Sequence, residues 1–297
     1  MFATSTALAA GVTPAQLRSA ELSQPFRGTN VLGTAKTLQE RGSACALRMS
    51  GPWAFCGVTA AQLHGMPLPP GFTAPHRPLD VAVLAPRSAP RAEGILGHKI
   101  KAHSFLVVLS GRLPLAHAAD AWCQLAAVLP REDLVAAGDF LLAGDVWAGA
   151  RRRPLCDRQE LEQAAARYAG KRGARNLRWA LERLRPDVDS RPESLLRLLL
   201  VAAGVPEPVV HLAVAVADGA IELHPDLALP DWGVVFEYQG DGHRDRDRYL
   251  GDINRNELLR AAGWEVIEVT SKDLFVDPDA FLARVSAVLR RRGLRLK

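Results

Sequence analysis

Residues 221–239 alternate between apolar and polar side chains on both sides of a turn signal, and this pattern constrains the fold more than any other in the chain. An alternation of period two predicts β-strands with their polar side chains on one face. The turn signal is Pro230–Gly233, so the two strands are expected to be antiparallel neighbours. The shared polar face carries three side chains with oxygen donors: Asp226, Glu237 and Gln239.

Asp226 and Glu237 are expected to lie across from each other, close enough to share one divalent cation. Mg²⁺ suits this set, with Mn²⁺ as the alternative ion, because hard cations prefer oxygen ligands and keep several waters. Such an ion activates a water molecule and stabilises the charge of a phosphodiester transition state. The alternative is that two acids on neighbouring strands simply meet solvent.

The residues around this pattern predict an α/β segment (α+β over the whole chain) in which one helix precedes three strands, a helix and a fourth strand. Capping residues, apolar periodicity and turn signals set the boundaries. The expected elements are a helix over 191–203, strands over 209–216, 221–229 and 234–239, a helix over 245–262 and a strand over 264–270. A final helix is expected to begin near Asp277.

This αβββαβ order, with the spacing D-x10-E-x-Q from Asp226 to Gln239, resembles the PD-(D/E)XK nuclease superfamily and its restriction-endonuclease-like core. More narrowly, the run from Gln239 to His243, together with Asp252, Arg255 and Gly263-Trp264, is similar to the very-short-patch-repair-like (Vsr-like) endonucleases. The resemblance covers roughly residue 187 to the C-terminus. It implies a metal-dependent DNA endonuclease of repair or defence, with Asp226 and Glu237 as metal ligands.

Carried over by position, the resemblance places Gln239 where the superfamily has a lysine. A lysine would stabilise the attacking water or the developing anion, whereas a neutral amide can only orient by hydrogen bonding. His243 is implied to orient a water or accept its proton, since an unperturbed imidazole titrates near neutrality. The alternative for His243 is an ordinary loop histidine.

Glu193 corresponds to a first-helix glutamate that faces the metal in the family. The run from Ser190 to Glu193 also fits a capping box with Pro192 at the first helical position, and capping alone would explain this glutamate. Arg255 follows Asp252 by three residues on one helix face. Both residues are expected to touch phosphate or brace the site, with an ordinary surface ion pair as the alternative for Asp252.

Basic side chains concentrate between residues 151 and 185, within a segment of helical periodicity. An arginine-rich helical segment beside a phosphodiesterase site is expected to contact phosphate. Its alternative is a solvated helical linker. The candidate nucleic-acid contacts in this segment are Arg151, Arg152, Arg153, Lys171, Arg172 and Arg175.

The first residues predict a helix-turn-helix-like region, with a turn at Gly11, a second helix capped by Thr13 and a small β wing over 25–32. This region is similar to the amino-terminal domain of abortive-infection-type (AbiEi-like) antitoxins. The groove-facing candidates are Gln16 and Arg18. This resemblance keeps open a second function, a non-catalytic DNA-binding regulator whose nuclease fold is degenerate.

The expected organisation is a helix-turn-helix-like region over 1–52, a mixed α/β domain over 53–150, a basic helical linker over 151–186 and the nuclease domain over 187–297. No apolar run reaches membrane-spanning length and the N-terminus has no export signal, so a cytoplasmic protein without a membrane partner is expected. The 4 cysteines are scattered, which predicts reduced thiols. DNA is the expected partner, as a duplex that is intact, nicked or mismatched. Phosphate chemistry does not separate it from RNA.

Overall fold

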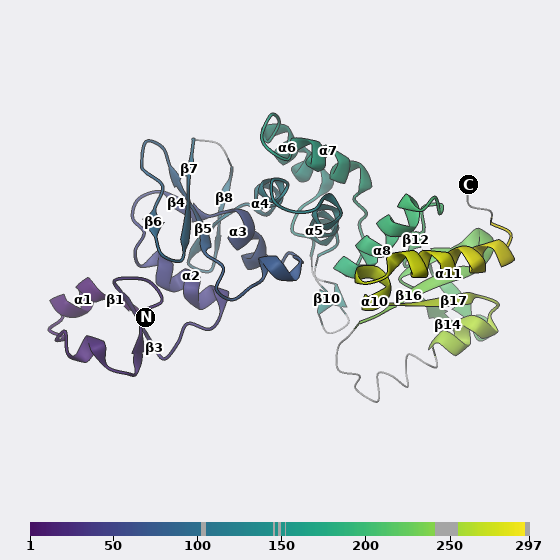
Figure 1. Ribbon diagram of the computed structural model, residues 1–297, viewed down its shortest axis with the longest axis horizontal. Coiled ribbons are helices and arrows are strands. Elements are labelled where there is room, and N and C mark those ends of the chain that lie inside the picture. The colour runs from purple at the N-terminus through teal and green to yellow at the C-terminus, as the bar shows by residue number, and fades with distance from the viewer. Residues whose placement is uncertain (102–104, 145, 148–149, 152, 241–254, 295–297) are drawn as a thin grey trace. The chain divides into compact units, whose positions relative to one another are not determined.

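The computed structural model confirms an α/β chain with several mixed sheets (Figure 1). It describes all residues except 102–104, 145, 148–149, 152, 241–254 and 295–297. The contacts divide the chain into two compact units: an N-terminal unit of Met1–Leu141 and Leu155–Glu182, and a C-terminal unit of Leu142–Pro154 and Arg183–Lys297. The four-part organisation expected from the sequence stays a prediction. Among the described residues, no helix has the length and apolar character needed to cross a bilayer.

A six-stranded mixed sheet forms the centre of the N-terminal unit. Its order is β6 (Arg91–Ala92), β7 (Ile95–Ile100), β5 (Leu79–Leu84), β4 (Trp53–Phe55), β9 (Leu113–Ala116) and β8 (Val107–Ser110). The unit's longer helices are α2 (Leu38–Ala46), α3 (Gly57–Leu63), α4 (Ala118–Leu125), α5 (Arg131–Ala143), α6 (Arg158–Arg167) and α7 (Ala174–Arg183). Phe55, Leu79 and Leu115 are almost wholly buried where α2 packs on this sheet, so apolar burial holds the layers together.

The first residues form a small sheet in the order β1 (Phe2–Ala3), β3 (Thr29–Leu32) and β2 (Leu22–Ser23). The expected first helix is α1 (Thr4–Ala9), but the expected second helix is wrong: only a 3₁₀ turn over Gln16–Arg18 follows. Thr13 donates its backbone N–H to Oε1 of Gln16 (2.8 Å), and Gln16 donates its N–H to Oγ1 of Thr13 (3.3 Å). This reciprocal cap closes one turn without extending it.

The C-terminal unit is built on a four-stranded sheet in the order β12 (Val209–Val210), β15 (Leu227–Leu229), β16 (Val234–Gln239) and β17 (Glu265–Thr270). β15 and β16 are antiparallel neighbours, as expected, whereas β16 and β17 are parallel. A parallel pair needs a crossover connection, and residues 255–261 are the described helical part of it.

The two long strands expected over 209–216 and 221–229 are each broken in the structure. Their outer parts, β13 (Val214–Val216) and β14 (Ile221–Leu223), pair with each other in a separate two-stranded sheet. One break follows from His211, which has a left-handed φ of 47° that no strand residue adopts. Pro225 lies in the other break, since proline has no N–H to donate to a ladder.

Apolar side chains cover both faces of the four-stranded sheet. On one face, α8 (Arg191–Ala202) and α11 (Pro278–Arg291) pack against Phe236 and its neighbours, and the short helix α10 (Ser271–Phe275) borders them (Figure 1). On the other face, Val235 packs with Leu259 of the crossover helix and with β13 and β14. The sheet is therefore a rigid platform, and the side chains at its ends are held in fixed positions.

Candidate active site

Asp226 and Glu237 lie across from each other at one end of the sheet, as the alternation predicted. Leu227 is the register partner of Phe236 in the antiparallel pair of β15 and β16. Continuing this register by one residue places Asp226 opposite Glu237. Oδ2 of Asp226 accepts the backbone N–H of Tyr238 at 2.7 Å. This bond ties the acid to the neighbouring strand and fixes the direction of its carboxyl group.

Glu193 reaches the same end of the sheet from the first turn of α8. Ser190 caps that helix by accepting the N–H of Glu193, and the glutamate carboxylate accepts the N–H of Asp189 at 3.0 Å. The reach-back bond therefore goes to the residue before the cap. Glu193 is only 6% exposed, and its Oε2 lies 3.6 Å from Nε2 of His211. The Ser190 cap is therefore formed without the reciprocal bond of a capping box, and the role of Glu193 in a metal site stays a prediction.

His211 is the site residue that the sequence analysis missed. It lies between β12 and β13, where its N–H donates to the backbone oxygen of Asp226 (3.3 Å). Its Nε2 lies 3.6 Å from both Glu193 and Asp189. The available signal is a single polar residue inside the apolar run 209–216, which the sequence pattern predicts to be one continuous strand.

Glu193, His211 and Asp226 bring one ligand atom each to within 4.8 Å of one another. This spacing approaches what one divalent ion requires of its ligands, which bind at about 2.0–2.2 Å from the metal. Carboxylate oxygens suit Mg²⁺ or Mn²⁺, whereas an imidazole nitrogen disfavours Mg²⁺ as a direct partner. The donor set therefore fits an oxygen-preferring ion held by the acids, with His211 beside it. The sequence predicts Asp226 and Glu237 as the ligand pair, whereas the trio found among the described residues is Glu193, His211 and Asp226, without Glu237.

Glu237 is 8% exposed, and its Oε1 lies 3.2 Å from Nε of Arg255. The guanidinium of Arg255 also donates to the backbone oxygen of His224. Of the roles expected for Arg255, the structure thus shows the bracing contact with the acid. A permanent positive charge stands beside Glu237, supplied by the crossover helix rather than by β16.

Burial and charge both act on the Asp226 carboxyl. Burial, followed by the charges of Glu193 and Glu237, raises its pKa to about 7. The polar contact with Glu193 at 3.6 Å and the nearby charges of Asp189 and Asp226 raise the pKa of His211, although burial acts to lower it. Negative charge thus accumulates where little solvent reaches it, an arrangement that a bound cation would relieve.

The metal-free C-terminal unit is expected to lose stability as pH rises from about 5 to about 8. The pKa of Asp226 is raised on folding, so its contribution is complete near pH 4 and is lost as pH rises through about 7. His211 acts in the same direction, since its pKa is also raised. Hydrogen exchange of the β15 and β16 amides in a chelator, corrected for intrinsic rates, measures this change. Rising protection over that interval would contradict it.

Gln239 ends β16 two residues after Glu237, which puts the amide and the acid on the same face. Its register partner on β17 is Thr270. His243, Asp252 and Arg152 lie outside the described residues.

The basic residues of the 151–185 segment are divided between the two units. Arg151 ends the short hairpin of β10 (Val146–Trp147) and β11 (Ala150–Arg151), and Arg153 follows as an exposed residue. Lys171, Arg172 and Arg175 are exposed around the connection from α6 to α7, in the N-terminal unit. The segment contains two helices, α6 and α7, separated by a turn.

Comparison with known proteins finds two relatives in Mycobacterium tuberculosis. They are Uncharacterized protein MT2308 of strain CDC 1551 / Oshkosh and Uncharacterized protein Rv2248 of strain ATCC 25618 / H37Rv. Each is 29% identical over 256 residues, which span 84% of this chain and 86% of the relative. No protein-family model and no solved structure matches.

Proposed function

We propose that the chain is a cytoplasmic, metal-dependent DNA endonuclease of the PD-(D/E)XK, Vsr-like kind. The observation that supports this most is the convergence of Glu193, Asp226 and Glu237 from one helix and two adjacent strands. Three carboxylates gathered at one sheet end, one of them with its pKa raised to about 7, are costly without a cation. We propose a nuclease in particular because the αβββαβ order around these acids resembles that of the PD-(D/E)XK nucleases.

Asp226 and Glu237 would hold the ion, with Glu193 completing the anionic wall. When bound, a divalent ion of the Mg²⁺ or Mn²⁺ class lowers the pKa of a water and offsets charge on a phosphodiester. Glu193 and Asp226 are held in place by their bonds to backbone N–H groups, so their oxygens are pre-positioned. His211 lies beside Glu193, with 3.6 Å between Nε2 and Oε2, and borders the acidic wall.

Gln239 carries no charge and would orient phosphate or water by hydrogen bonding alone. The superfamily lysine would supply a positive charge at this position. In this chain, Arg255 supplies a permanent charge next to Glu237 from the crossover helix. We infer that Arg255 takes over part of the electrostatic role, because a cation near the scissile phosphate stabilises the transition state wherever it is anchored.

The test is cleavage of supercoiled plasmid and of a mismatched duplex with Mg²⁺, with Mn²⁺ and with a chelator. Glu237→Gln keeps the shape of the side chain and removes its charge, so it is expected to abolish cleavage. Glu222→Gln is the matched control, since Glu222 is exposed on β14 and outside the cluster. Cleavage that persists in chelator, or that is equal in both variants, would rule out the proposed site.

A second function is favoured by Gln239 and by the ion pair that already occupies Glu237. A non-catalytic DNA-binding regulator could keep the nuclease fold while its site lacks the lysine and one of its acids, Glu237, is paired with Arg255. In that case the full chain would bind duplex DNA without cutting it, and binding would be equal with and without metal. Gel-shift and cleavage assays on the same protein separate the two functions.

A further inference from the structure

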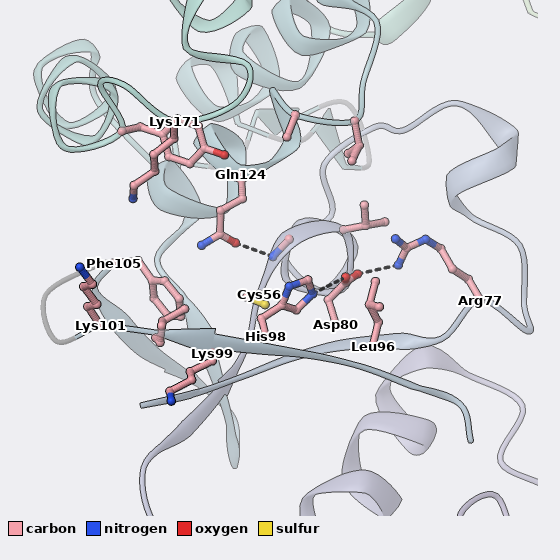
Figure 2. Close-up of a pocket in the computed structure, with 16 residues that line it drawn as sticks. Cys56, Arg77, Asp80, Leu96, His98, Lys99, Lys101, Phe105, Gln124 and Lys171 are labelled. Carbon is pink, nitrogen blue, oxygen red and sulfur yellow. Dashed lines mark hydrogen bonds and ion pairs between the residues drawn. The ribbon is translucent and has the colours of Figure 1, made fainter. Parts of the chain in front are cut away.

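The N-terminal unit contains a cavity of about 510 Å³ that the proposed nuclease site does not use. Its walls come from β7, the start of α3, the end of α4 and the connection after α6 (Figure 2). All these elements belong to one compact unit, so the cavity is defined without reference to the rest of the chain. Its volume lies within the range of small-molecule sites, about 300–1,000 Å³.

A buried ionic group fixes one side of the cavity. Asp80 is 4% exposed; its Oδ2 lies 2.6 Å from Nη1 of Arg77, and its Oδ1 lies 3.0 Å from Nε2 of His98 (Figure 2). Burial acts to raise the pKa of Asp80, but the bonds with His98 and Arg77 lower it below its usual value. The carboxylate therefore holds the imidazole and the guanidinium in place while its own charge is compensated.

Gln124 presents a hydrogen-bond donor to the same space. Its Oε1 accepts the backbone N–H of Gly57 at 2.6 Å, which fixes the amide plane (Figure 2). Within the described part of the chain, the Nε2 group of this amide has no acceptor. A partly buried amide donor held in a fixed direction is the kind of polar group that orients a ligand in an otherwise apolar site.

The lining has an excess of positive charge. Lys101 and Lys171 are exposed at the cavity, and Arg77 adds a third cation; Lys99 also lines it, but its ammonium is turned away from His98 (Figure 2). Among the described lining residues, Asp80 is the sole carboxylate, and it is already paired. The Cys56 thiol is neutral, because burial raises its pKa far above the usual range. The cavity therefore favours an anion, held without covalent chemistry.

The rest of the wall is apolar, and this excludes a simple inorganic anion as the best occupant. Val58, Phe105 and Val128 line the space together with the aliphatic Leu96, which is 48% exposed. A lone phosphate would leave these surfaces against water. A ligand that joins an anionic group to a flat, weakly polar body would cover both parts, since such a body packs on aliphatic and aromatic side chains.

We propose that this cavity binds a nucleotide, with its phosphate at the lysines and its base against the apolar wall beside Gln124. Two sources share this chemistry: a free nucleoside monophosphate, and one nucleotide of a single-stranded segment. In either case Nε2 of Gln124 donates to a base acceptor. The exposed ring of His98, set by Asp80, supplies the second polar contact.

The first experiment measures binding to the full chain in chelator by isothermal titration calorimetry. The probes are dTMP, dAMP, thymidine, inorganic phosphate and a short single-stranded oligothymidine. We expect the monophosphates to bind about tenfold or more tightly than thymidine or phosphate alone, because charge-assisted and apolar contacts add. Binding of phosphate as tight as that of dTMP, or no binding of any probe, would overturn the proposal. Tighter oligothymidine binding identifies the strand as the source.

Variants then locate the site. Lys171→Ala is expected to weaken dTMP binding about tenfold, whereas Lys36→Ala, which removes an exposed lysine of the same unit outside the lining, leaves it unchanged. Gln124→Glu keeps the acceptor for Gly57, so the fold is retained, but it replaces the donor by a negative charge; binding should fall further. Equal effects of the two cation variants would overturn the assignment. Glu237→Gln serves to separate this site from the nuclease proposal, since it should leave dTMP binding unaltered.

Discussion

Asp226→Asn is expected to give a metal-free protein that is more stable than the wild type at about pH 8 and that no longer cleaves DNA. The substitution removes a buried charge beside Glu193 and Glu237, while the amide oxygen still accepts the N–H of Tyr238. The gain in unfolding free energy is expected to be about 2 kcal/mol, since partial solvent contact reduces the full effect of the pKa shift. Metal-dependent cleavage should fall roughly 1,000-fold.

The two effects are measured on the same preparations. Hydrogen exchange of β15 and β16 in chelator gives stability, and plasmid nicking with Mg²⁺ or Mn²⁺ gives activity. Asp231→Asn is the control, because Asp231 is an exposed acid in the turn between the same two strands. If Asp226→Asn instead lowered the unfolding free energy in chelator, the ionised carboxylate would not be destabilising the metal-free protein. That outcome would remove the electrostatic reason to expect a bound cation.

Arg197→Ala is expected to destabilise the C-terminal unit by about 3 kcal/mol. Arg197 is fully buried on α8, where its guanidinium lies 2.7 Å from Glu207 and donates to the backbone oxygen of Arg183 at 2.7 Å. Its loss leaves Glu207 with the weaker, more exposed pair to Arg185 (3.2 Å) and opens a cavity behind the helix that carries Glu193.

Urea unfolding followed by exchange in α8 and β16 measures this loss. Arg290→Ala is the matched control, because it removes an exposed arginine from α11. Among the described residues its guanidinium donates to a single backbone oxygen, that of Ser286 in its own helix, so stability should change by at most about 0.5 kcal/mol. Similar values for both variants would mean that the buried arginine does not hold α8 in place.

The alternation over residues 221–239 predicted correctly that Asp226 and Glu237 are opposite each other. Side-chain direction in a strand depends on local dihedral angles, and register follows from the turn that joins the strands. The same local logic predicted Ser190 as the cap of α8. It failed at the second helix near Thr13, because capping residues favour the start of a helix but do not supply the apolar burial that extends it.

The sequence by itself determined the α/β class, the polar edge of β15 and β16 and the first turn of α8. Only the tertiary structure decided that His211 turns back toward Glu193, that Arg255 pairs with Glu237, and that the basic residues are divided between two units. The cavity around Asp80 also joins residues far apart in the chain. Periodicity acts over a few residues and sets the face of a helix or strand on which a side chain lies. Which side chains of different elements come into contact is set by the packing of the whole core.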